Sequence, residues 1–446
     1  MRRGLSRTAL TCLLACALVV ITSSRHVAAY SVLAHEAAVD ALWTDTIAPL
    51  LKQRFPQISP EDLLKARAYA YGGAVIQDLG YFPFGSPLFT NLVHYVRSGA
   101  FVEALLRDAR DVNELAFAIG ALAHYASDNS GHPHAVNRVI PLMYPKIQAR
   151  YGDEVLYVNA KAQHVMVEFA FDVSQVAQGA YVATAYHDFI GFEVAERVLN
   201  QAFLETYGLE AKDLFLDQDL AIGTYRRAVG KTIPQLTELA WREKQDEILE
   251  RNPKIERSAF VYALSPRDYD QTFGTKYRKP GFFARFLIFV AKVVPKIGPF
   301  RPLAFEPLTA DAEQLFLESL KASRDAYRQS LVALRAGRLN LRDTDFDTGE
   351  LSGRSENPLA DETYAELLGK LSDSNFAGVS TELRAELNRY YAAPRSAQTM
   401  DRKRRKQHEE ALRHLTALNS GPGATACAQC AEQLKRGPET EQASKR

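Results

Sequence analysis

The sequence predicts an all-α fold, a bundle of many helices, and three observations support this. Apolar residues recur with the helical period of about 3.6 residues over long stretches. No stretch shows the sustained apolar–polar alternation or the clusters of β-branched residues that are typical of a sheet. Breakers such as Ser59-Pro60 and Gly72-Gly73 separate the periodic stretches, as expected where helices are joined by turns.

The N-terminal half contains most of the expected helices. Ser59 followed by Pro60 and two acids is typical of a helix start, because a capping hydroxyl precedes a proline in the first turn. Gly72-Gly73 is expected to end this helix, and a Gly- and Pro-rich irregular segment follows. Helices are expected at residues 30–43, 47–55, 60–71, 101–128 with a break near Asp111, 156–173 and 190–250.

The C-terminal half is expected to be mostly helical but less continuous. Residues 308–336 predict one long amphipathic helix, and residues 361–392 and 399–418 predict shorter ones. Residues 342–358 are polar, acidic and rich in breakers, which predicts a linker or an exposed loop. The division that follows is a region at 251–341, a linker at 342–358, helices at 359–418 and a disordered tail at 419–446.

Residues 1–29 have the composition of a secretory signal peptide. Three arginines precede an apolar run from Thr8 to Thr22, and Val27-Ala28-Ala29 forms a small-residue cleavage site. The prediction is an exported protein, periplasmic, secreted or envelope-associated, whose mature chain begins at Tyr30. An uncleaved membrane anchor is the alternative, although the apolar run is short for a membrane span.

Charge and cysteine content restrict the functional classes. The chain has 446 residues and a formal net charge of +1, so no overall charge attracts it to nucleic acid. After signal cleavage only Cys427 and Cys430 remain, in a CAQC sequence. In an exported protein such a pair is a disulfide, a redox pair or an incidental feature of the tail.

The residues from Ala121 to Arg138 carry the strongest chemical signal. His124 and Asp128 stand four residues apart, so both side chains leave the same face of a helix. His134 follows, and His164 with Glu168 repeats the four-residue spacing. A lone histidine on a helix is usually a core or surface residue, but several buried ionisable groups would be costly without a cation. The set therefore predicts a site for a zinc-type ion.

One apolar stretch stands apart from this pattern. Lys279–Phe305 interleaves aromatic and aliphatic residues with single basic ones, and is too short and too charged to span a bilayer. This composition suits a helix lying in a membrane interface. The alternative is that the stretch completes the protein core.

In order along the chain, eight residues resemble the ligand set of the zinc-dependent phospholipase C family, whose fold and metal centre are shared with single-strand-specific zinc nucleases. The resemblance covers residues 30–170 and extends to about 250, which defines an expected catalytic domain at 30–250. The matching residues are His35, Asp78, His94, His124, Asp128, His134, His164 and Glu168.

The resemblance implies an all-α domain that holds about three zinc ions. Asp128 would bridge two neighbouring ions. The implied ligands are Asp78, His94, His124 and Asp128 for one ion, His35, Asp128 and the N-terminal Tyr30 for the second, and His134, His164 and Glu168 for the third. Tyr30 would bind through backbone atoms, where the family usually has Trp.

The resemblance also suggests roles for individual residues. Asp78 is the implied general base, although the sequence alone leaves Glu168 as an alternative. Tyr81, Phe82 and Phe84 either line a head-group pocket or pack their loop. From its position alone, His132 is expected to be a spare polar residue at the mouth of the site, with contact to metal or phosphate as the alternative. Asp172 lies four residues beyond Glu168 on the same face and is expected to support a ligand, not to bind metal itself.

Three functional hypotheses follow. The first is an exported zinc-dependent phosphodiesterase that hydrolyses phospholipids, with peripheral membrane contact through residues 279–305 and no specific nucleic-acid partner. The second keeps the metal chemistry but takes single-stranded nucleic acid as substrate, which would need stacking aromatics and a basic groove. The third is a non-catalytic envelope protein whose C-terminal half binds a membrane or a partner.

Overall fold

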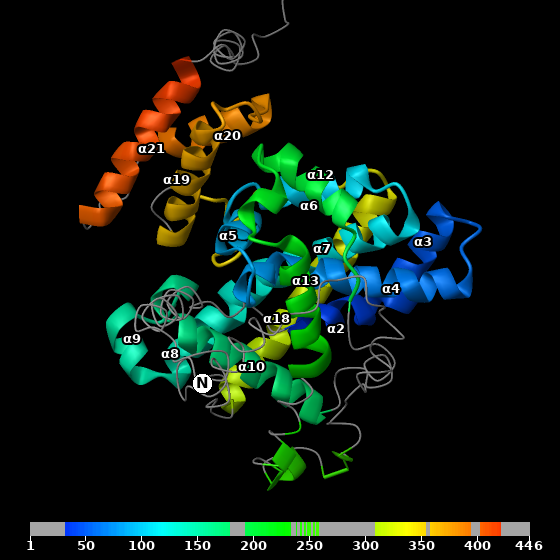
Figure 1. The fold of residues 1–446 in the computed structure, drawn as a ribbon. Helices are drawn as coiled ribbons and strands as arrows, with labels where there is room; N and C mark the ends of the chain where they lie inside the picture. The colour runs from blue at the N-terminus through cyan, green and yellow to red at the C-terminus, as the bar shows by residue number, and fades with distance from the viewer. Residues whose placement is uncertain are drawn as a thin grey trace, which may run out of the picture.

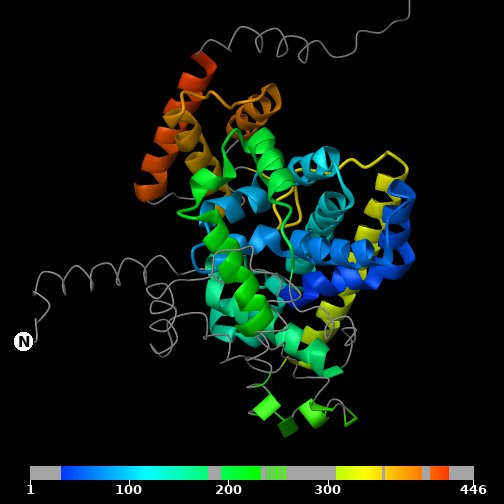
Figure 2. The same ribbon diagram turned by 45° about the vertical axis from the view of Figure 1, so that its right-hand side comes forward.

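A computed structural model describes residues 32–178, 192–232, 308–353, 357–393 and 402–420, with isolated positions between 238 and 257. The described residues form an all-α bundle (Figures 1 and 2), which confirms the predicted fold class. The one β-type pairing among these residues is an isolated antiparallel bridge between Thr344 and Leu351.

Among the described residues up to 232, most helices fall in the predicted periodic stretches. The exceptions are three helices at Pro87–Tyr95, Asn137–Met143 and Pro145–Tyr151, which were not predicted, and an interruption between Tyr207 and Gln218 in the stretch predicted for 190–250. Asp111 caps α7 because its carboxylate accepts hydrogen bonds from the amides of Asn113 and Glu114, which explains the predicted break. The elements are α2 (Val32–Leu42), η1 (Trp43–Ile47), α3 (Ala48–Arg54), α4 (Pro60–Val75), η2 (Ile76–Tyr81), α5 (Pro87–Tyr95), α6 (Ser98–Asp108), α7 (Val112–Gly131), η3 (His132–Val136), α8 (Asn137–Met143), α9 (Pro145–Tyr151), η4 (Tyr157–Asn159), α10 (Lys161–Gln178), α12 (Glu196–Tyr207), η5 (Ala211–Leu214), α13 (Gln218–Arg227) and η6 (Ala228–Thr232).

Helix α4 corrects one prediction, because it runs through Gly72-Gly73 instead of ending there. A Cβ on Gly73 would lie 1.8 Å from the carbonyl oxygen of Phe117, and a Cβ on Gly120 would lie 1.9 Å from that of Ala70. The glycines therefore let the backbones of α4 and α7 approach more closely than any side chain would allow. They act as contact residues between two helices, not as breakers.

Helix α18 (Ala310–Arg335) confirms the predicted long helix and packs along α7. Figures 1 and 2 show it in yellow, crossing the bundle beside the blue N-terminal helices. The hydroxyl of Tyr327 donates to the carbonyl of Ile119 at 3.0 Å, and Ser323 Oγ donates to the carbonyl of Ser127 at 3.4 Å. A segment far along the chain therefore buttresses the helix that carries His124.

The last three described helices form a smaller group beside α5. They are α19 (Pro358–Asp373), α20 (Thr381–Ala392) and α21 (Arg402–Ser420), drawn in orange and red (Figure 1). Tyr364 of α19 stacks on Tyr390 of α20 with ring centroids 3.5 Å apart. Helix α19 also packs on α5, which carries His94, so this group adjoins the candidate site.

Residues 343–352, here called the closing segment, differ from the exposed linker expected for 342–358. Thr344, Asp345, Phe346, Asp347 and Ser352 are all buried. The segment forms no helix. Single backbone hydrogen bonds to other parts of the chain hold it in place; the amide of Phe346, for example, donates to the carbonyl of His94 at 3.1 Å. Its polar composition reflects buried hydrogen bonding, not exposure to water.

Several expectations lie outside the described residues. These are the signal peptide with Tyr30, the apolar stretch Lys279–Phe305, and the tail with Cys427 and Cys430. Among the residues that are described, no helix combines the length and the apolar character that crossing a membrane requires.

Candidate metal centre

Four elements converge on one buried point in the bundle. Helix α2 brings His35, η2 brings Asp78, α5 brings His94, and α7 brings His124 and Asp128. These five side chains are between 0% and 1% exposed. Segments separated by up to about ninety positions in sequence thus place imidazoles and carboxylates side by side. Within α7, the four-residue spacing of His124 and Asp128 had predicted this for the two of them.

The first part of the centre consists of two overlapping groups, called the paired ligand groups. One contains His35, His124 and Asp128, and the other Asp78, His94 and His124; within each, the candidate ligand atoms lie within 4.8 Å of one another. The Nε2 atom of His124 is 3.0 Å from Asp128 Oδ2 and 3.4 Å from His94 Nε2. A cation between these nitrogens and carboxylate oxygens would compensate their burial.

Backbone carbonyls fix the orientation of two of the imidazoles. His124 Nδ1 lies 2.9 Å from the carbonyl oxygen of Ala74, and His94 Nδ1 lies 2.9 Å from that of Thr90. A carbonyl oxygen can only accept, so each Nδ1 carries a proton, and Nε2 is the ring nitrogen left to bind a cation. This arrangement is typical of histidines that bind metal ions.

The third ligand group contains His132, His164 and Glu168, again with ligand atoms within 4.8 Å. His164 Nε2 lies 2.8 Å from Glu168 Oε1, so the four-residue pair expected on α10 is present. His132 Nε2 lies 3.8 Å from both Glu168 Oε1 and Asp128 Oδ1. His132 therefore connects this group to the paired ligand groups.

His134, one of the eight residues of the resemblance, does not join this group. It is exposed, and His132 takes the inward position instead. The helical path continues from α7 through the π-helical turn η3, so His132 stays one turn from Asp128 on the same face. The expectation for this ligand is corrected from His134 to His132.

Burial and neighbouring charges perturb the titration of the cluster. Burial alone would lower the pKa of His94, but Asp128 and Asp78 raise it to about 9. Burial lowers the pKa of His132 to about 4, and burial together with His124 lowers that of His35. Burial would raise the pKa of Asp128, but the histidines around it, His124 first, hold it well below its usual value.

The donor set matches the chemistry of zinc. Zinc binds neutral imidazole nitrogen and carboxylate oxygen, and all three groups supply these atoms without sulfur. The lowered pKa values of His35, His132 and His164 keep these rings neutral at pH 7, which is the form that binds a cation. The side chains present therefore fit a zinc centre.

The aromatic residues near Asp78 have separate surroundings. Tyr81 is buried, with its ring centroid 6.1 Å from that of His94 and 5.9 Å from that of Tyr157. Phe82 stacks on Tyr225 with centroids 3.8 Å apart, which is a packing contact. Phe84 is half-buried at a positive φ of 68°. Of the three, Tyr81 lies beside a candidate ligand.

Asp172 supports the N-terminal end of the described chain. Its Oδ2 accepts a hydrogen bond from the amide of Leu33 at 3.2 Å, two residues before His35. This contact ties α10 to α2 and so connects the element of the third ligand group to that of His35. The partner in this bond is a backbone amide and not a candidate ligand, so the expected support of a ligand by Asp172 stays a prediction.

Sequence reasoning missed the closing segment altogether. The ring of Phe346 lies 5.2 Å from that of His94 and 6.0 Å from that of His124. Asp347 Oδ1 lies 3.8 Å from His132 Nδ1. Burial and Asp345 raise the pKa of Asp347, so a nearby cation would favour its ionised form.

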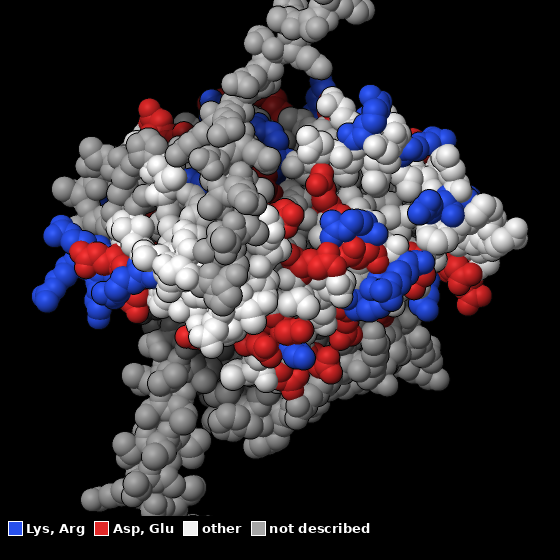
Figure 3. Space-filling view, turned by 90° about the horizontal axis from the view of Figure 1, so that it is seen from above, with Lys and Arg blue, Asp and Glu red and all other residues white. Residues whose placement is uncertain are grey.

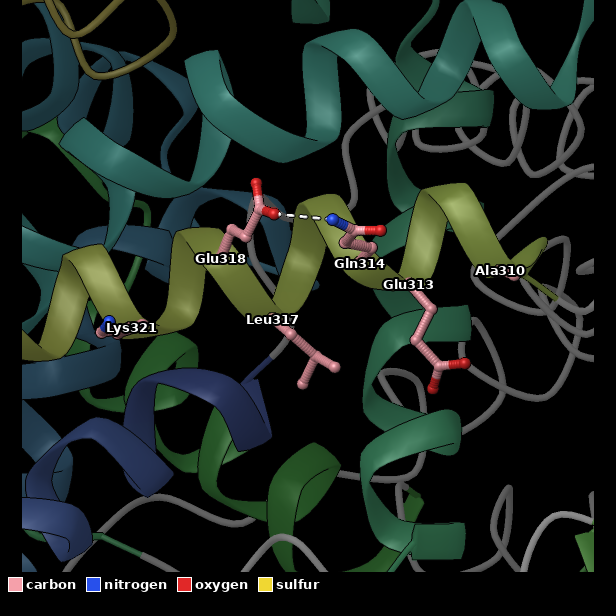
Figure 4. Close-up of a pocket in the computed structure, with 6 residues that line it drawn as sticks. All are labelled: Ala310, Glu313, Gln314, Leu317, Glu318 and Lys321. Carbon is pink, nitrogen blue, oxygen red and sulfur yellow. Dashed lines mark hydrogen bonds between the residues drawn. The ribbon is translucent and has the colours of Figure 1, made fainter.

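A surface pocket elsewhere has a different character. It lies along α18 and is lined by Ala310, Glu313, Gln314, Leu317, Glu318 and Lys321 (Figure 4). Its side chains come from successive turns of one helix, and Gln314 Nε2 donates to Glu318 Oε1 at 2.9 Å. None of its residues belongs to the three ligand groups, so the chemistry of the site does not involve this pocket.

Comparison with known proteins agrees with this geometry. Residues 34–216 match the family described as zinc dependent phospholipase C. Searches of curated proteins and of solved structures gave no match. The matched residues contain every side chain of the three ligand groups. Residues 34–216, here called the family domain, are therefore similar to the zinc-dependent phospholipase C family.

Proposed function

We propose that this protein is an exported zinc-dependent phosphodiesterase that hydrolyses phospholipids at a centre of about three zinc ions. The observation that carries the proposal is the continuity of the three ligand groups. His124 belongs to both paired ligand groups, and His132 lies within 3.8 Å of carboxylate oxygens of Asp128 and Glu168. A mononuclear structural site would not need such an extended set.

The zinc ions, Asp128 and Asp78 would have different roles in the reaction. When bound, zinc ions would lower the pKa of a water molecule toward 7 and neutralise negative charge on phosphoryl oxygens. Asp128 lies between the two parts of the centre and supplies the negative charge that they share. Burial raises the pKa of Asp78, which makes its carboxylate a better acceptor for the proton of the attacking water.

Lipid is favoured over nucleic acid as the substrate. The matched family is described as zinc dependent phospholipase C, and the match covers all the ligand groups. On the face shown in Figure 3, basic and acidic side chains of the described residues lie interspersed, without the basic groove that tracks a phosphate backbone. The apolar, basic stretch Lys279–Phe305 supports contact with a membrane surface, and residues 1–29 support export.

The test is an assay of the purified mature protein on two substrates in parallel. We expect about three equivalents of bound zinc and release of phosphocholine from phosphatidylcholine vesicles, with little cleavage of single-stranded DNA. His124→Ala removes a side chain common to both paired ligand groups and should lower turnover by more than about 100-fold. Circular dichroism would verify that its helices remain folded.

The outcomes separate the hypotheses. Less than one equivalent of zinc in the mature protein would contradict the metal centre. Cleavage of DNA without release of phosphocholine would assign the protein to the nuclease branch. Zinc binding without hydrolysis of either substrate would favour a binding role.

A further inference from the structure

The closing segment lies outside the family domain but is attached to its ligand-bearing helices. The matched residues end at 216, whereas the closing segment comprises residues 343–352. Ser98 Oγ donates to the carbonyl of Thr344 at 2.6 Å, and Ser352 Oγ donates to the carbonyl of Tyr95 at 2.7 Å. Tyr95 directly follows His94, so the helix that places this candidate ligand also places the segment.

Within the segment, Asp347 is held from three sides. The amide of Tyr157 donates to its carboxylate at 3.0 Å, and Asn137 Nδ2 donates to its backbone carbonyl at 2.6 Å. Its own amide donates to Asp345 Oδ1 at 2.9 Å. With 1% of its surface exposed, the carboxylate has little freedom to turn away.

The carboxylate of Asp347 lies behind the ring of His132. Asp347 Oδ1 is 3.8 Å from Nδ1 of His132, slightly longer than a direct hydrogen bond, and it is the carboxylate that faces this nitrogen. The other ring nitrogen, Nε2, is 3.8 Å from the carboxylates of Asp128 and Glu168. The imidazole thus has one nitrogen directed at the ligand groups and the other at Asp347.

We propose that Asp347 is a positioning residue of the metal centre, which accepts the Nδ1 proton of His132 and so presents Nε2 to the third zinc ion. The proposal rests on the proposed function for the presence of that ion. Metal-binding histidines commonly donate their second N–H to a carboxylate or a carbonyl, and removing such a partner weakens metal binding about 10–100-fold.

The group that faces Nδ1 comes from a different part of the chain for His132 than for the histidines of the paired ligand groups. His94 and His124 direct Nδ1 to the carbonyls of Thr90 and Ala74, both inside the family domain. His132 has its carboxylate partner on a segment more than one hundred residues beyond that domain. The ring of Phe346, 0% exposed and 5.2 Å from His94, ties the same segment to the paired ligand groups.

The test uses the full chain with three substitutions. Asp347→Ala removes the acceptor, Asp347→Asn keeps an amide oxygen that can accept from Nδ1, and Glu350→Gln is the matched control. Glu350 is exposed on the same segment, so its change removes a carboxylate charge without touching the centre. The readouts are the affinity of each zinc ion in chelator competition and the nitrogen-15 NMR spectrum of the histidine rings.

We expect Asp347→Ala to weaken binding of the third zinc ion by about 10–100-fold, Asp347→Asn to restore part of that affinity, and Glu350→Gln to match the wild type. In the zinc-loaded wild type, Nδ1 of His132 should carry the proton, and its resonance should shift in Asp347→Asn. If Asp347→Ala does not fold, these two NMR observations decide the matter by themselves.

Two results would overturn the proposal. One is unchanged zinc affinity in a folded Asp347→Ala protein, and the other is a proton on Nε2 of His132 in the zinc-loaded wild type. If the wild type binds no zinc, both the proposed function and this inference fail. If the wild type binds zinc and the variants behave alike, only this inference fails.

Discussion

The paired ligand groups and the third ligand group are built in different ways. In the paired groups, His94 and His124 are oriented by carbonyls of helices within the family domain, and α7 is brought close to α4 by glycines. In the third group, α10 supplies His164 and Glu168, while His132 faces a carboxylate from the distant closing segment. The geometry of the paired ligand groups therefore depends on helix packing, whereas that of the third ligand group depends also on the position of the closing segment.

The largest expected effect tests which histidine completes the third ligand group. His132→Ala should abolish binding of one zinc ion, because its Nε2 faces the carboxylates of Glu168 and Asp128. His134→Ala should keep the full metal content, since His134 is exposed and outside the groups. Metal analysis after gel filtration measures both variants. Loss of zinc in His134→Ala alone would restore the assignment expected from the sequence.

His132 and His134 also show which ligands could be predicted from the sequence. The four-residue rule found His124 with Asp128 and His164 with Glu168, because both pairs lie within single helices. The same rule points from Asp128 to His132. Gly131 and Pro133 hide this relation in the sequence, because both residue types commonly end helices, whereas here the chain continues through a π-helical turn with Pro133 near its start.

The closing segment marks the limit of this kind of prediction. Its contacts join residues far apart in the chain, such as Asp347 with Tyr157, and no local period encodes them. A polar, breaker-rich composition is shared by exposed loops and by buried loops whose polar groups are paired. The helices were predictable from periodicity, but the attachment of irregular residues to the centre depends on tertiary packing.

A second prediction targets the helix contact beneath the paired ligand groups. Gly120→Ala would place a Cβ 1.9 Å from the carbonyl oxygen of Ala70 and force α4 away from α7. We expect a loss of about 1–3 kcal/mol in the free energy of unfolding. Zinc binding at the paired groups should weaken too, because α4 supplies the Ala74 carbonyl that orients His124. Chemical denaturation and chelator competition measure the two effects.

Gly369→Ala is the matched control for this substitution. Gly369 lies inside α19, and a Cβ there would meet nothing within 4 Å. Replacing a glycine within a helix by alanine should stabilise the protein by about 0.5–1 kcal/mol. Equal effects of the two substitutions would show that the approach of α4 to α7 has no special importance for the centre.

The smallest expected effect separates the two parts of the centre by their response to pH. Burial alone would lower the pKa of His94, but Asp128 and Asp78 raise it to about 9, so the metal-free paired groups hold a proton at pH 7. Zinc must displace that proton, and its affinity there should rise about tenfold per pH unit between 7 and 9.

The third ligand group should respond differently over the same range. Burial lowers the pKa of His132 to about 4, and burial with His132 lowers that of His164, so both rings are already neutral at pH 7. Raising the pH from 7 to 9 therefore removes no proton from these rings and leaves their zinc affinity nearly constant. Chelator competition at pH 7, 8 and 9, with His132→Ala used to identify the third ion, measures both slopes. Equal slopes would mean that the carboxylates around His94 do not hold its proton, and the electrostatic distinction between the two parts would be lost.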